Sequence, residues 1–562
     1  MKSGLWKKIG LSLVTAAIAF ILPSGATAQA PQYAFRVSFR DKAGSPPVTA
    51  SSSFLSSRSL ARRNRLGVAV DETDRPVATA YIDSALQLTG GVLHLRSRWF
   101  NYAVLLLTDS SKIGLLASKP WVTGVQVVGY YSTGLHARPA SPSDSNSGGP
   151  VPTGTTGSSA YYGNAWSQTN MVHGDVLHDA GFQGQGMLIA VMDEGFSELY
   201  SHPGFSGLRS SGRFVDSFQF VKRTSTGVAS SSYHGMAVLS TMAGSISGSF
   251  VGSAPAAQYA VYVTEEGGRE QPIELDNLVA ATERADSIGA DIVHASLGYN
   301  TFDYPLGADF TFSQFDGKTT LVARAANLAV SKGILFVTTS GNEGANSWMR
   351  LLTPGDADSA LTVGSVDPNR VPAPNSGYGP NAAGRIKPDV AAQGQPAAVL
   401  DVNGTVGFST GTSFAAPQIA GWAACLWQAH PNLTPGRIRE AINRSADRYS
   451  NPGQQVGYGI PDFGKAHLSL GIPDLPAGGA PFTIGSNPFG SQISIFTQLT
   501  SSGLLNLTLV DVTGKQVWAK EEQVYSGTQA LSWPTPANLP GGIYFLRLAS
   551  GDVFQVFKVM HR

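Results

Sequence analysis

A serine at the start of a run of small apolar residues is the feature of this sequence that most strongly suggests chemistry. Ser413 stands in the segment Gly-Thr-Ser-Phe-Ala-Ala-Pro, which runs from Gly411 to Pro417. Residues 414–427 predict a buried helix whose alanines leave little bulk on its surface. Backbone N–H groups are free at a helix start, so an oxyanion formed beside Ser413 would be stabilised there. A serine that merely caps a helix is the alternative.

A carboxylate and an imidazole that could activate such a serine lie upstream. Asp193 ends the apolar run 187–192, which is typical of a parallel strand buried on both faces. Strands of this kind carry ligand crevices at their carboxyl ends. His234 opens a segment rich in glycine and alanine, which predicts a tightly packed helix. An aspartate ending a strand and a satisfied core histidine remain the alternatives, and His202 is the nearest competing histidine.

The chain order Asp, His, Ser and the residues around each of them resemble the subtilisin-like serine proteases, or subtilases. The resemblance implies that Ser413 is the nucleophile, that His234 is its general base and that Asp193 orients His234. It also implies an α/β fold, with a subtilisin-like parallel sheet that carries helices on both faces. An α+β propeptide and a small C-terminal β-sandwich would flank that unit.

Two strand-end motifs extend the resemblance. Residues 333–344 read as a buried strand ending in Ser-Gly-Asn-Glu-Gly, and the resemblance implies that the Asn342 amide donates to the oxyanion beside the Ser413 N–H. Residues 291–298 read as a second strand, ending in Ser-Leu-Gly. In the family this edge pairs with the substrate backbone and lines the S1 pocket. The substrate-binding residues expected here are Ser296, Leu297, Gly298, Ser340 and Gly341.

The sequence departs from the family pattern beside both motifs. His294 and Ala295 precede Ser-Leu-Gly, and Thr339 and Ser340 stand where alanines are more common. These differences are expected to alter the shape of the pocket and to leave the reaction unchanged. An ordinary strand-end turn would be the preferred interpretation of Asn342 if its segment stood alone.

The N-terminus predicts secretion. Lys2, Lys7 and Lys8 precede an apolar stretch, and small residues around Ala28 offer a cleavage site, so residues 1–28 are predicted to be a signal peptide. A retained anchor helix is the alternative, but the apolar stretch is shorter than the roughly 20 residues that a membrane span needs.

Residues 29–133 are predicted to form a separate α+β unit. Its expected elements are strands at 33–39, 99–107 and 122–128 and helical segments at 57–66 and 110–118. This pattern resembles the inhibitory propeptide of subtilases. The cluster Arg58, Arg62, Arg63 and Arg65 is interpreted as a solvated helix face and not as a processing site. Residues 134–158, rich in Ser, Gly and Pro, are expected to be a linker.

A second small unit is predicted after the peptidase-like region 159–471 and the linker 472–483. Residues 484–562 contain about seven short alternating segments, which favour a β-sandwich. The Asn-Pro-Phe opening, an Asp-x-x-Gly-Lys turn, Gly-Gly-Ile-Tyr and a basic C-terminus resemble the sorting domain read by the Bacteroidetes Por (type IX) secretion system. A generic carbohydrate-binding or stabilising sandwich is the alternative.

Composition narrows the classes of partner. Charged residues make up 14% of the 562 residues and the formal net charge is +1, which argues against nucleic acid as a partner and offers no basic stripe for a membrane. The single cysteine, Cys425, excludes an intramolecular disulfide. The resemblance implies no cofactor for the chemistry. Family members often bind structural calcium, but no compact ligand motif marks such a site here.

The sequence therefore predicts a secreted serine endopeptidase that hydrolyses peptide bonds through an Asp-His-Ser triad and an Asn-assisted oxyanion hole. Its expected partners are protein or peptide substrates, its own propeptide as inhibitor, and the type IX secretion machinery. Export would pass through the periplasm to an extracellular or surface-attached location. A catalytically silent surface-binding protein of the same fold is the alternative, and a transpeptidase with the same triad is also conceivable.

Overall fold

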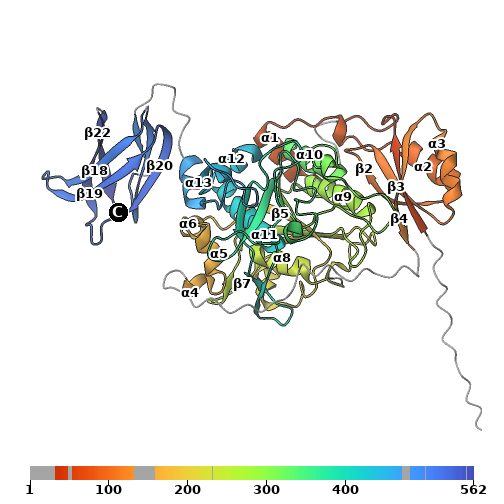
Figure 1. Ribbon diagram of the computed structural model, residues 1–562, viewed down its shortest axis with the longest axis horizontal. Helices are drawn as coiled ribbons and strands as arrows, with labels where there is room; N and C mark the ends of the chain where they lie inside the picture. The colour runs from red at the N-terminus through yellow and green to blue at the C-terminus, as the bar shows by residue number, and fades with distance from the viewer. Residues whose placement is uncertain are drawn as a thin grey trace, which may run out of the picture.

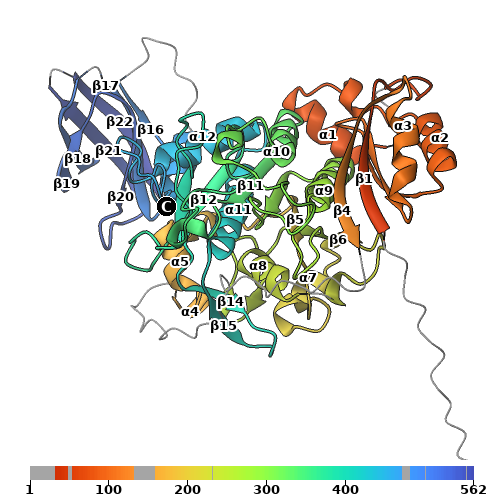
Figure 2. The same cartoon turned by 45° about the vertical axis from the view of Figure 1, so that its right-hand side comes forward.

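The computed structural model describes residues 32–48, 54–131, 159–230, 232–470, 481–485, 487–499, 501–551 and 553–562. The expected signal peptide (1–28), the linker 134–158 and most of the linker 472–483 lie outside these residues. Figures 1 and 2 show an N-terminal unit (residues 32–131) and a C-terminal unit (481–562) on opposite sides of a large central unit (159–470). In the described residues, no helix combines the length and the hydropathy needed to cross a membrane.

The central unit is built on a seven-stranded sheet in the order β13-β12-β11-β10-β5-β9-β6, and every neighbouring pair is parallel. The strands are β5 (Leu188–Asp193), β6 (Phe214–Gln219), β9 (Gln258–Val263), β10 (Ile292–Ala295), β11 (Leu335–Thr339), β12 (Leu361–Val366) and β13 (Val390–Gln393). Residues of β5, β10 and β11 are all buried, as expected for strands covered on both faces. The parallel sheet predicted from the sequence is confirmed.

Helices cover both faces of this sheet. Alternate residues of β5 face different cores: Ile189 and Val191 pack with α8 (His234–Ala243) and α11 (Thr412–Ala429), and Ala190 packs with α9 (Ile273–Ile288) and α10 (Leu321–Ser331). The remaining helices are α4 (Ser159–Tyr162), α5 (Trp166–Met171), α6 (Asp175–Asp179), α7 (Ser206–Ser210), α12 (Pro435–Ser445) and α13 (Phe463–Leu470). Two small hairpins pair β7 (Ser245–Ile246) with β8 (Phe250–Val251) and β14 (Ala397–Leu400) with β15 (Val406–Ser409).

Helix α11 runs through the middle of the core, and its residues from Thr412 to Trp427 are all buried. Small residues make this possible. A Cβ placed on Gly421 would overlap the Ser253 side chain, so only glycine fits at that point of the helix. The burial of this helix fixes the position of its first turn, which carries Ser413.

The N-terminal unit is a four-stranded antiparallel sheet in the order β2-β3-β1-β4. Its elements are β1 (Gln32–Phe39), α1 (Ser57–Leu66), α2 (Thr79–Thr89), β2 (Val92–Ser97), β3 (Tyr102–Leu107), α3 (Gly114–Ala117) and β4 (Val122–Tyr131). One face of the sheet packs in a core with α2 and α3, and the other packs against α9 and α10 of the central unit. The elements α2 and β2 were not predicted from the sequence.

Helix α1 stands apart from the rest of its unit. Figures 1 and 2 both show it over the central unit, away from α2 and α3. Arg62 and Arg63 are only 1% exposed, so the interpretation of this arginine cluster as a solvated helix face is wrong for both residues. Arg58 and Arg65 keep about a third of their side-chain surface and bind Asp291. One face of α1 packs against a polar surface of the central unit. The sequence of α1 alone does not reveal that surface.

The C-terminal unit packs two antiparallel sheets, β16-β17-β20 and β19-β18-β21-β22, around one apolar core. Its strands are β16 (Phe482–Ile484), β17 (Gln492–Leu499), β18 (Gly503–Asp511), β19 (Gln516–Val524), β20 (Gly527–Pro534), β21 (Gly542–Ser550) and β22 (Val553–His561). The predicted β-sandwich is confirmed. Motif residues have structural roles here: Asn487 bonds the backbone of Lys558 and Met560, and Asp511 accepts the N–H of Lys515 in its turn.

Candidate active site

Asp193 and His234 are in direct contact. Asp193 is the last residue of β5 and His234 is the first residue of α8, and the His234 Nδ1 lies 2.7 Å from the Asp193 Oδ1. An ionised carboxylate can only accept, so the Nδ1–H donates and the Nε2 is the ring nitrogen left to take up a proton. Gly235 permits this approach, because a Cβ there would stand 2.7 Å from the Asp193 Cβ. The glycine after the histidine is thus a requirement of the contact.

Burial determines the electrostatics of this pair. Asp193 is fully buried, and the loss of hydration raises the pKa of its carboxyl, while His234 acts in the opposite direction. The Asp193 Oδ1 also accepts the Glu194 N–H at 2.9 Å, and its Oδ2 has no hydrogen-bond partner among the described residues. A buried carboxylate with so few other partners stabilises a positive charge on the adjacent imidazole.

Ser413 lies close to this pair. It is the second residue of α11, it is 5% exposed, and the ring of the next residue, Phe414, lies 5.6 Å from the His234 ring between centroids. His234 opens α8 and Phe414 lies in the first turn of α11, so the first turns of both helices are next to each other, near Asp193 at the end of β5. Ser413, next to Phe414 in the chain, thus lies near the Asp193–His234 pair, and its role as the third member of a triad stays a prediction.

Asn342 is held in a defined orientation at the end of β11. Its Oδ1 accepts the Thr412 N–H at 2.9 Å and the Thr412 hydroxyl at 3.0 Å. Because these donors occupy the oxygen, the Nδ2 is the end of the amide that can donate elsewhere. The Thr339 hydroxyl bonds the Thr412 hydroxyl and accepts the Gly341 N–H at 3.1 Å. Thr339, which departs from the family pattern, therefore also holds Thr412, the residue before Ser413, in place.

His294 takes part in a hydrogen-bond relay that sequence reasoning missed. The His294 Nε2 lies 2.8 Å from the Ser296 Oγ, and the Ser296 hydroxyl donates to the Ser413 carbonyl at 2.8 Å. His294 is fully buried, and burial lowers its pKa to about 3, so the ring is neutral at pH 7. Because the Ser296 hydroxyl donates its hydrogen bond to the Ser413 carbonyl, the Ser296 oxygen accepts a hydrogen bond from the His294 Nε2–H. Both residues thereby fix the backbone of Ser413.

The two strand ends expected to bind substrate enclose a leucine that the sequence analysis did not single out. The Leu352 side chain contacts both Gly298 and Gly341: a Cβ on Gly298 would lie 2.7 Å from the Leu352 Cβ, and one on Gly341 would lie 2.6 Å from the Leu352 Cγ. The Leu352 N–H bonds the Ser340 carbonyl at 3.1 Å. Leu297 lies beside this group and is partly buried. The motif glycines thus make room for Leu352.

A group of carboxylates lies near the start of α9. Glu265, Glu270 and Glu274 each place an oxygen within 4.8 Å of the others. Glu274 accepts two backbone N–H groups, from Glu266 and Gln271, and Glu265 accepts the Tyr299 hydroxyl at 2.7 Å. Burial raises the pKa of Glu265 to about 7, which favours its protonated form. Glu265 and Glu274 already accept protein donors, and we assign no ion to this group.

The side chains of the candidate active site lie at one edge of the sheet, the edge formed by the carboxyl ends of its strands. Asp193, Ser296 and Asn342 stand at or just after the carboxyl ends of β5, β10 and β11, and His234 and Ser413 stand in the first turns of α8 and α11. This is the edge at which open α/β sheets carry their ligand crevices. The arrangement offers a hydroxyl, an imidazole backed by a buried carboxylate, and an oriented amide donor.

Two family models match the chain. The subtilase family model matches residues 184–460, and the model of the peptidase S8 propeptide domain of Bacteroidota matches residues 34–143. Together they span the central unit that carries these residues and the N-terminal unit that packs against it.

The chain is also similar to individual known proteins, including subtilisins. Subtilisin NAT from Bacillus subtilis subsp. natto is 29% identical over 285 residues, which cover 50% of this chain and 66% of the relative, so the chain spans just under two thirds of that protein. Subtilisin from Bacillus pumilus is 29% identical over 280 residues, covering 49% of this chain and 90% of the relative. The crystal structure of MycP1 with the N-terminal propeptide removed aligns at 24% identity and a TM-score of 0.43, over 55% of this chain and 98% of that one. The chain belongs to the subtilase family, peptidase family S8, and carries that family's Bacteroidota-type propeptide domain.

Proposed function

We propose that this protein is a secreted serine endopeptidase that hydrolyses peptide bonds. The observation that carries the proposal is the 2.7 Å contact between the His234 Nδ1 and the Asp193 Oδ1, at the place where α11 presents Ser413. Such a contact fixes the tautomer and the orientation that a general base needs. Its position at the start of two helices suits a reaction in which negative charge develops.

Ser413 is the nucleophile in this mechanism. Its Oγ attacks the carbonyl carbon of the scissile bond while the His234 Nε2 takes the hydroxyl proton and then gives it to the leaving amine. Asp193 stabilises the imidazolium that forms in between. A water molecule then attacks the acyl-enzyme with the same base, which releases the acid product and restores Ser413.

The negative oxygen of each tetrahedral intermediate needs donors that are already in place. The Asn342 Nδ2 and the Ser413 N–H are proposed for this role. The support for Asn342 is that two donors from Thr412 hold its oxygen, so the amide does not have to reorganise as charge develops. Ser296, Leu297, Gly298, Ser340 and Gly341 are proposed to bind the substrate backbone and its P1 side chain.

Covalent labelling tests the nucleophile. A fluorophosphonate should label the mature enzyme, and Ser413→Ala should abolish both labelling and hydrolysis while the fold is retained. Ser211→Ala, which changes an exposed serine, is the matched control and should remain fully labelled. A wild-type protein that is folded, free of residues 29–133 and unlabelled would favour the silent surface-binding protein of this fold. Analysis of products would reveal a transpeptidase.

We further propose that residues 1–28 direct export, that residues 29–133 inhibit the enzyme until they are removed, and that 134–158 is the connecting linker. If maturation is autocatalytic, Ser413→Ala should accumulate with residues 29–133 attached. Processing of this variant at the normal rate in the purified state would point to a second protease.

The proposal for residues 484–562 is a sorting domain read by the type IX secretion machinery, which would carry the protein from the periplasm to the outside or the cell surface. A hollow of about 670 Å³ lies between this unit and α12 and α13, which is consistent with a loosely attached module. Deleting residues 484–562 should leave peptide hydrolysis near normal in vitro and should trap the protein in the periplasm of its host. Normal export of the truncated chain would reject the sorting role.

A further inference from the structure

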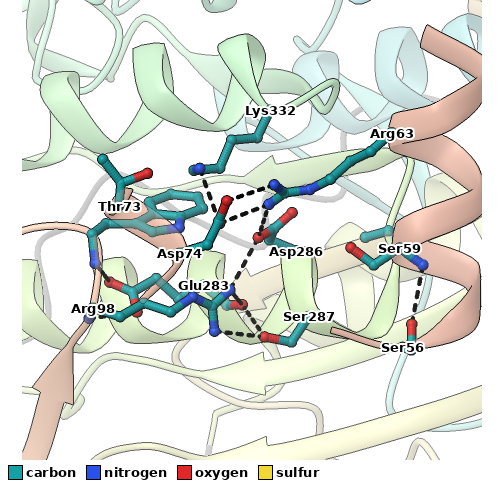
Figure 3. A network of polar contacts seen from close by, with 12 residues as sticks. Ser56, Ser59, Arg63, Thr73, Asp74, Arg98, Glu283, Asp286, Ser287 and Lys332 are labelled. Carbon is teal, nitrogen blue, oxygen red and sulfur yellow. Dashed lines mark hydrogen bonds and ion pairs between the residues drawn. The ribbon is translucent and has the colours of Figure 1, made fainter. Parts of the chain in front are cut away.

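One peptidase carboxylate receives three arginines of the propeptide domain. The Asp286 carboxylate, near the end of α9, accepts from the Arg62 Nη2 at 2.6 Å, the Arg63 Nη2 at 2.8 Å and the Arg98 Nη2 at 3.0 Å. Asp286 has no exposed side-chain surface. Figure 3 shows Arg63 and Arg98 reaching it from different segments of the propeptide domain. The main partners of this buried charge thus belong to a segment that maturation would remove.

Helix α1 docks at the amino ends of the sheet strands. The Arg58 side chain donates to the carbonyls of Gly186 at 2.7 Å and Gly289 at 3.0 Å, and Arg62 donates to the carbonyl of Ala290. Gly186 precedes β5, and Gly289 and Ala290 precede β10. The helix also comes close to the backbone, because a Cβ on Gly289 would lie 2.6 Å from the Ser59 nitrogen.

A further ion pair completes this contact, and in it the cation belongs to the central unit and the anion to the propeptide domain. Lys332, just before β11, lies 2.9 Å from the Asp74 carboxylate of the propeptide domain, and Asp74 also binds Arg63 at 2.7 Å. Lys332 and Asp74 are both almost fully buried. Figure 3 shows the chain of contacts from Lys332 through Asp74 and Arg63 to Asp286. Cations and anions therefore come from both sides of the interface.

This contact lies at the opposite edge of the sheet from Asp193, Ser296 and Asn342. The strands between the two edges have four to six residues, which places the edges roughly 13–20 Å apart. We name the contact surface on the central unit, made of Asp286, Asp291, Lys332 and the carbonyls of Gly186, Gly289 and Ala290, the amino-edge site. Its ligand is the helix α1, which presents arginines on one face, together with Asp74 and Arg98 of the propeptide domain.

The propeptide domain has a second contact, between its sheet and α9. A hollow of about 450 Å³ lies there, and its lining includes Leu95, Arg98, Phe220, Ala280 and Glu283. Arg36 binds Asp276 at 2.6 Å on this face, beside another hollow of about 240 Å³. The propeptide domain is thus held by two polar contacts, and the amino-edge site is the one in which three arginines share a single carboxylate.

We propose that the amino-edge site holds the propeptide domain on the peptidase after the chain between them has been cut, whether or not the substrate cleft is occupied. Leaving this site would strip Asp286 of three guanidinium partners at once, and breaking buried ion pairs from one side slows release more than it alters encounter. The inference rests on the proposed function only in taking residues 134–158 as the segment that is cut. It adds a binding site for an arginine-bearing helix, remote from the reacting groups, that controls release of the propeptide.

The test uses the full chain carrying Ser413→Ala and a recognition sequence for an unrelated protease within residues 134–158. After cutting, the rate at which the propeptide domain leaves is measured by size-exclusion chromatography after dilution. Asp286→Asn, which keeps the shape of the side chain, should raise that rate by at least about tenfold. Arg370→Gln, which breaks the 2.9 Å pair with Asp447 inside the central unit, is the matched control and should leave the rate unchanged.

A double-mutant cycle guards against a simple folding defect. Arg62→Gln attacks the same contact from the propeptide side, and the Asp286→Asn/Arg62→Gln pair should lose much less than the sum of the two single effects. Full additivity, or a wild-type rate in both single variants, would overturn the proposal. Circular dichroism before cutting establishes that each variant is folded.

The position of the engineered cut separates the amino-edge site from the cleft. A cut near residue 134 removes the tail that could reach the cleft, and a cut near residue 157 retains it. Similar release rates from the two complexes are expected. Fast release only after the early cut would show that the tail holds the domain and would reject the proposal. Because Ser413→Ala needs no hydrolysis, these outcomes are independent of whether the proposed peptidase activity is correct.

Discussion

The Ser296 hydroxyl donates a 2.8 Å hydrogen bond to the carbonyl oxygen of Ser413. In an uninterrupted helix that carbonyl would accept the N–H of the residue four positions later, but this residue is Pro417, which has none. Ser296 supplies the missing donor from the end of β10. A proline in the helix thus frees an acceptor, and the strand motif Ser-Leu-Gly satisfies it, so the two motifs depend on each other.

Ser296→Ala should reduce turnover by loosening the backbone of Ser413. The change leaves the Ser413 carbonyl and the His294 Nε2–H without their partner, at a cost in stability of about 1–3 kcal/mol for each unsatisfied buried group. We expect kcat to fall with little change in KM, because the defect lies in the position of the nucleophile. Steady-state kinetics on a short peptide, together with thermal unfolding, measures both effects. Unchanged kcat in a destabilised protein would restrict Ser296 to a structural role.

Asn342→Ala should lower kcat by about 10²–10³ with a small change in KM, because its amide acts on the oxyanion and not on the bound substrate. Asn375→Ala is the control, since the Asn375 amide lies 3.4 Å from the Asn342 oxygen but belongs to a neighbouring loop. That variant should retain most of the activity. A loss confined to KM in Asn342→Ala would contradict its assignment as an oxyanion donor.

Leu352 should limit the enzyme to substrates with small P1 side chains. Its side chain occupies the space between Gly298 and Gly341, on the two edges proposed to line this pocket. Leu352→Ala should raise kcat/KM for large apolar P1 residues relative to alanine, as measured on a peptide library. Leu351→Ala, a fully buried neighbour, is the control: it should cost about 2–5 kcal/mol of stability without altering the preference.

His178 should make the fold sensitive to acid. It is buried against Tyr162 and the Ser253 carbonyl, and burial lowers its pKa to about 4. Since the unfolded chain takes up a proton at about pH 6.5 and the folded protein does not, stability is lost as the pH falls from about 6.5 to about 4, by up to about 3 kcal/mol.

Denaturant unfolding between pH 7 and pH 4 measures this dependence. His178→Gln should make the free energy of unfolding less steep with pH in that range. His173 gives a contrast of opposite sign, because Asp462 raises the pKa of its imidazole, so its contribution is present at low pH and lost as the pH rises. An unchanged slope in His178→Gln would show that His178 is not a source of the acid sensitivity.

Local sequence signals predicted the parallel sheet of the central unit well, because its strands and helices each have a strong pattern of their own. Helix α1 was predicted with its observed bounds, since Ser56 caps its start and Gly67 adopts φ 67° at its end. Helix α2 has no side-chain cap at Ala78, and β2 is a mixture of exposed and buried positions, so neither element gave a clear signal.

Other features could not be read locally because they depend on residues distant in sequence. The burial of Arg62 comes from Asp286, which the pattern of α1 does not contain. His294 looked like a departure from the family pattern, and its role depends on Ser296 and on the carbonyl freed by Pro417. The place of Leu352 depends on the two strand ends with Gly298 and Gly341, which enclose its side chain only in the folded protein.

The deep burial of α11 also governs when the protein could become reactive during its own synthesis. Asp193 and His234 emerge from the ribosome long before Ser413, and the helix that carries Ser413 packs among earlier segments of the core and against α12 and α13, which follow it. Its first turn is therefore positioned only when almost the whole central unit has assembled around it. A partly made or unfolded chain would hold the three groups far apart, so the topology itself delays cleavage until folding is nearly complete.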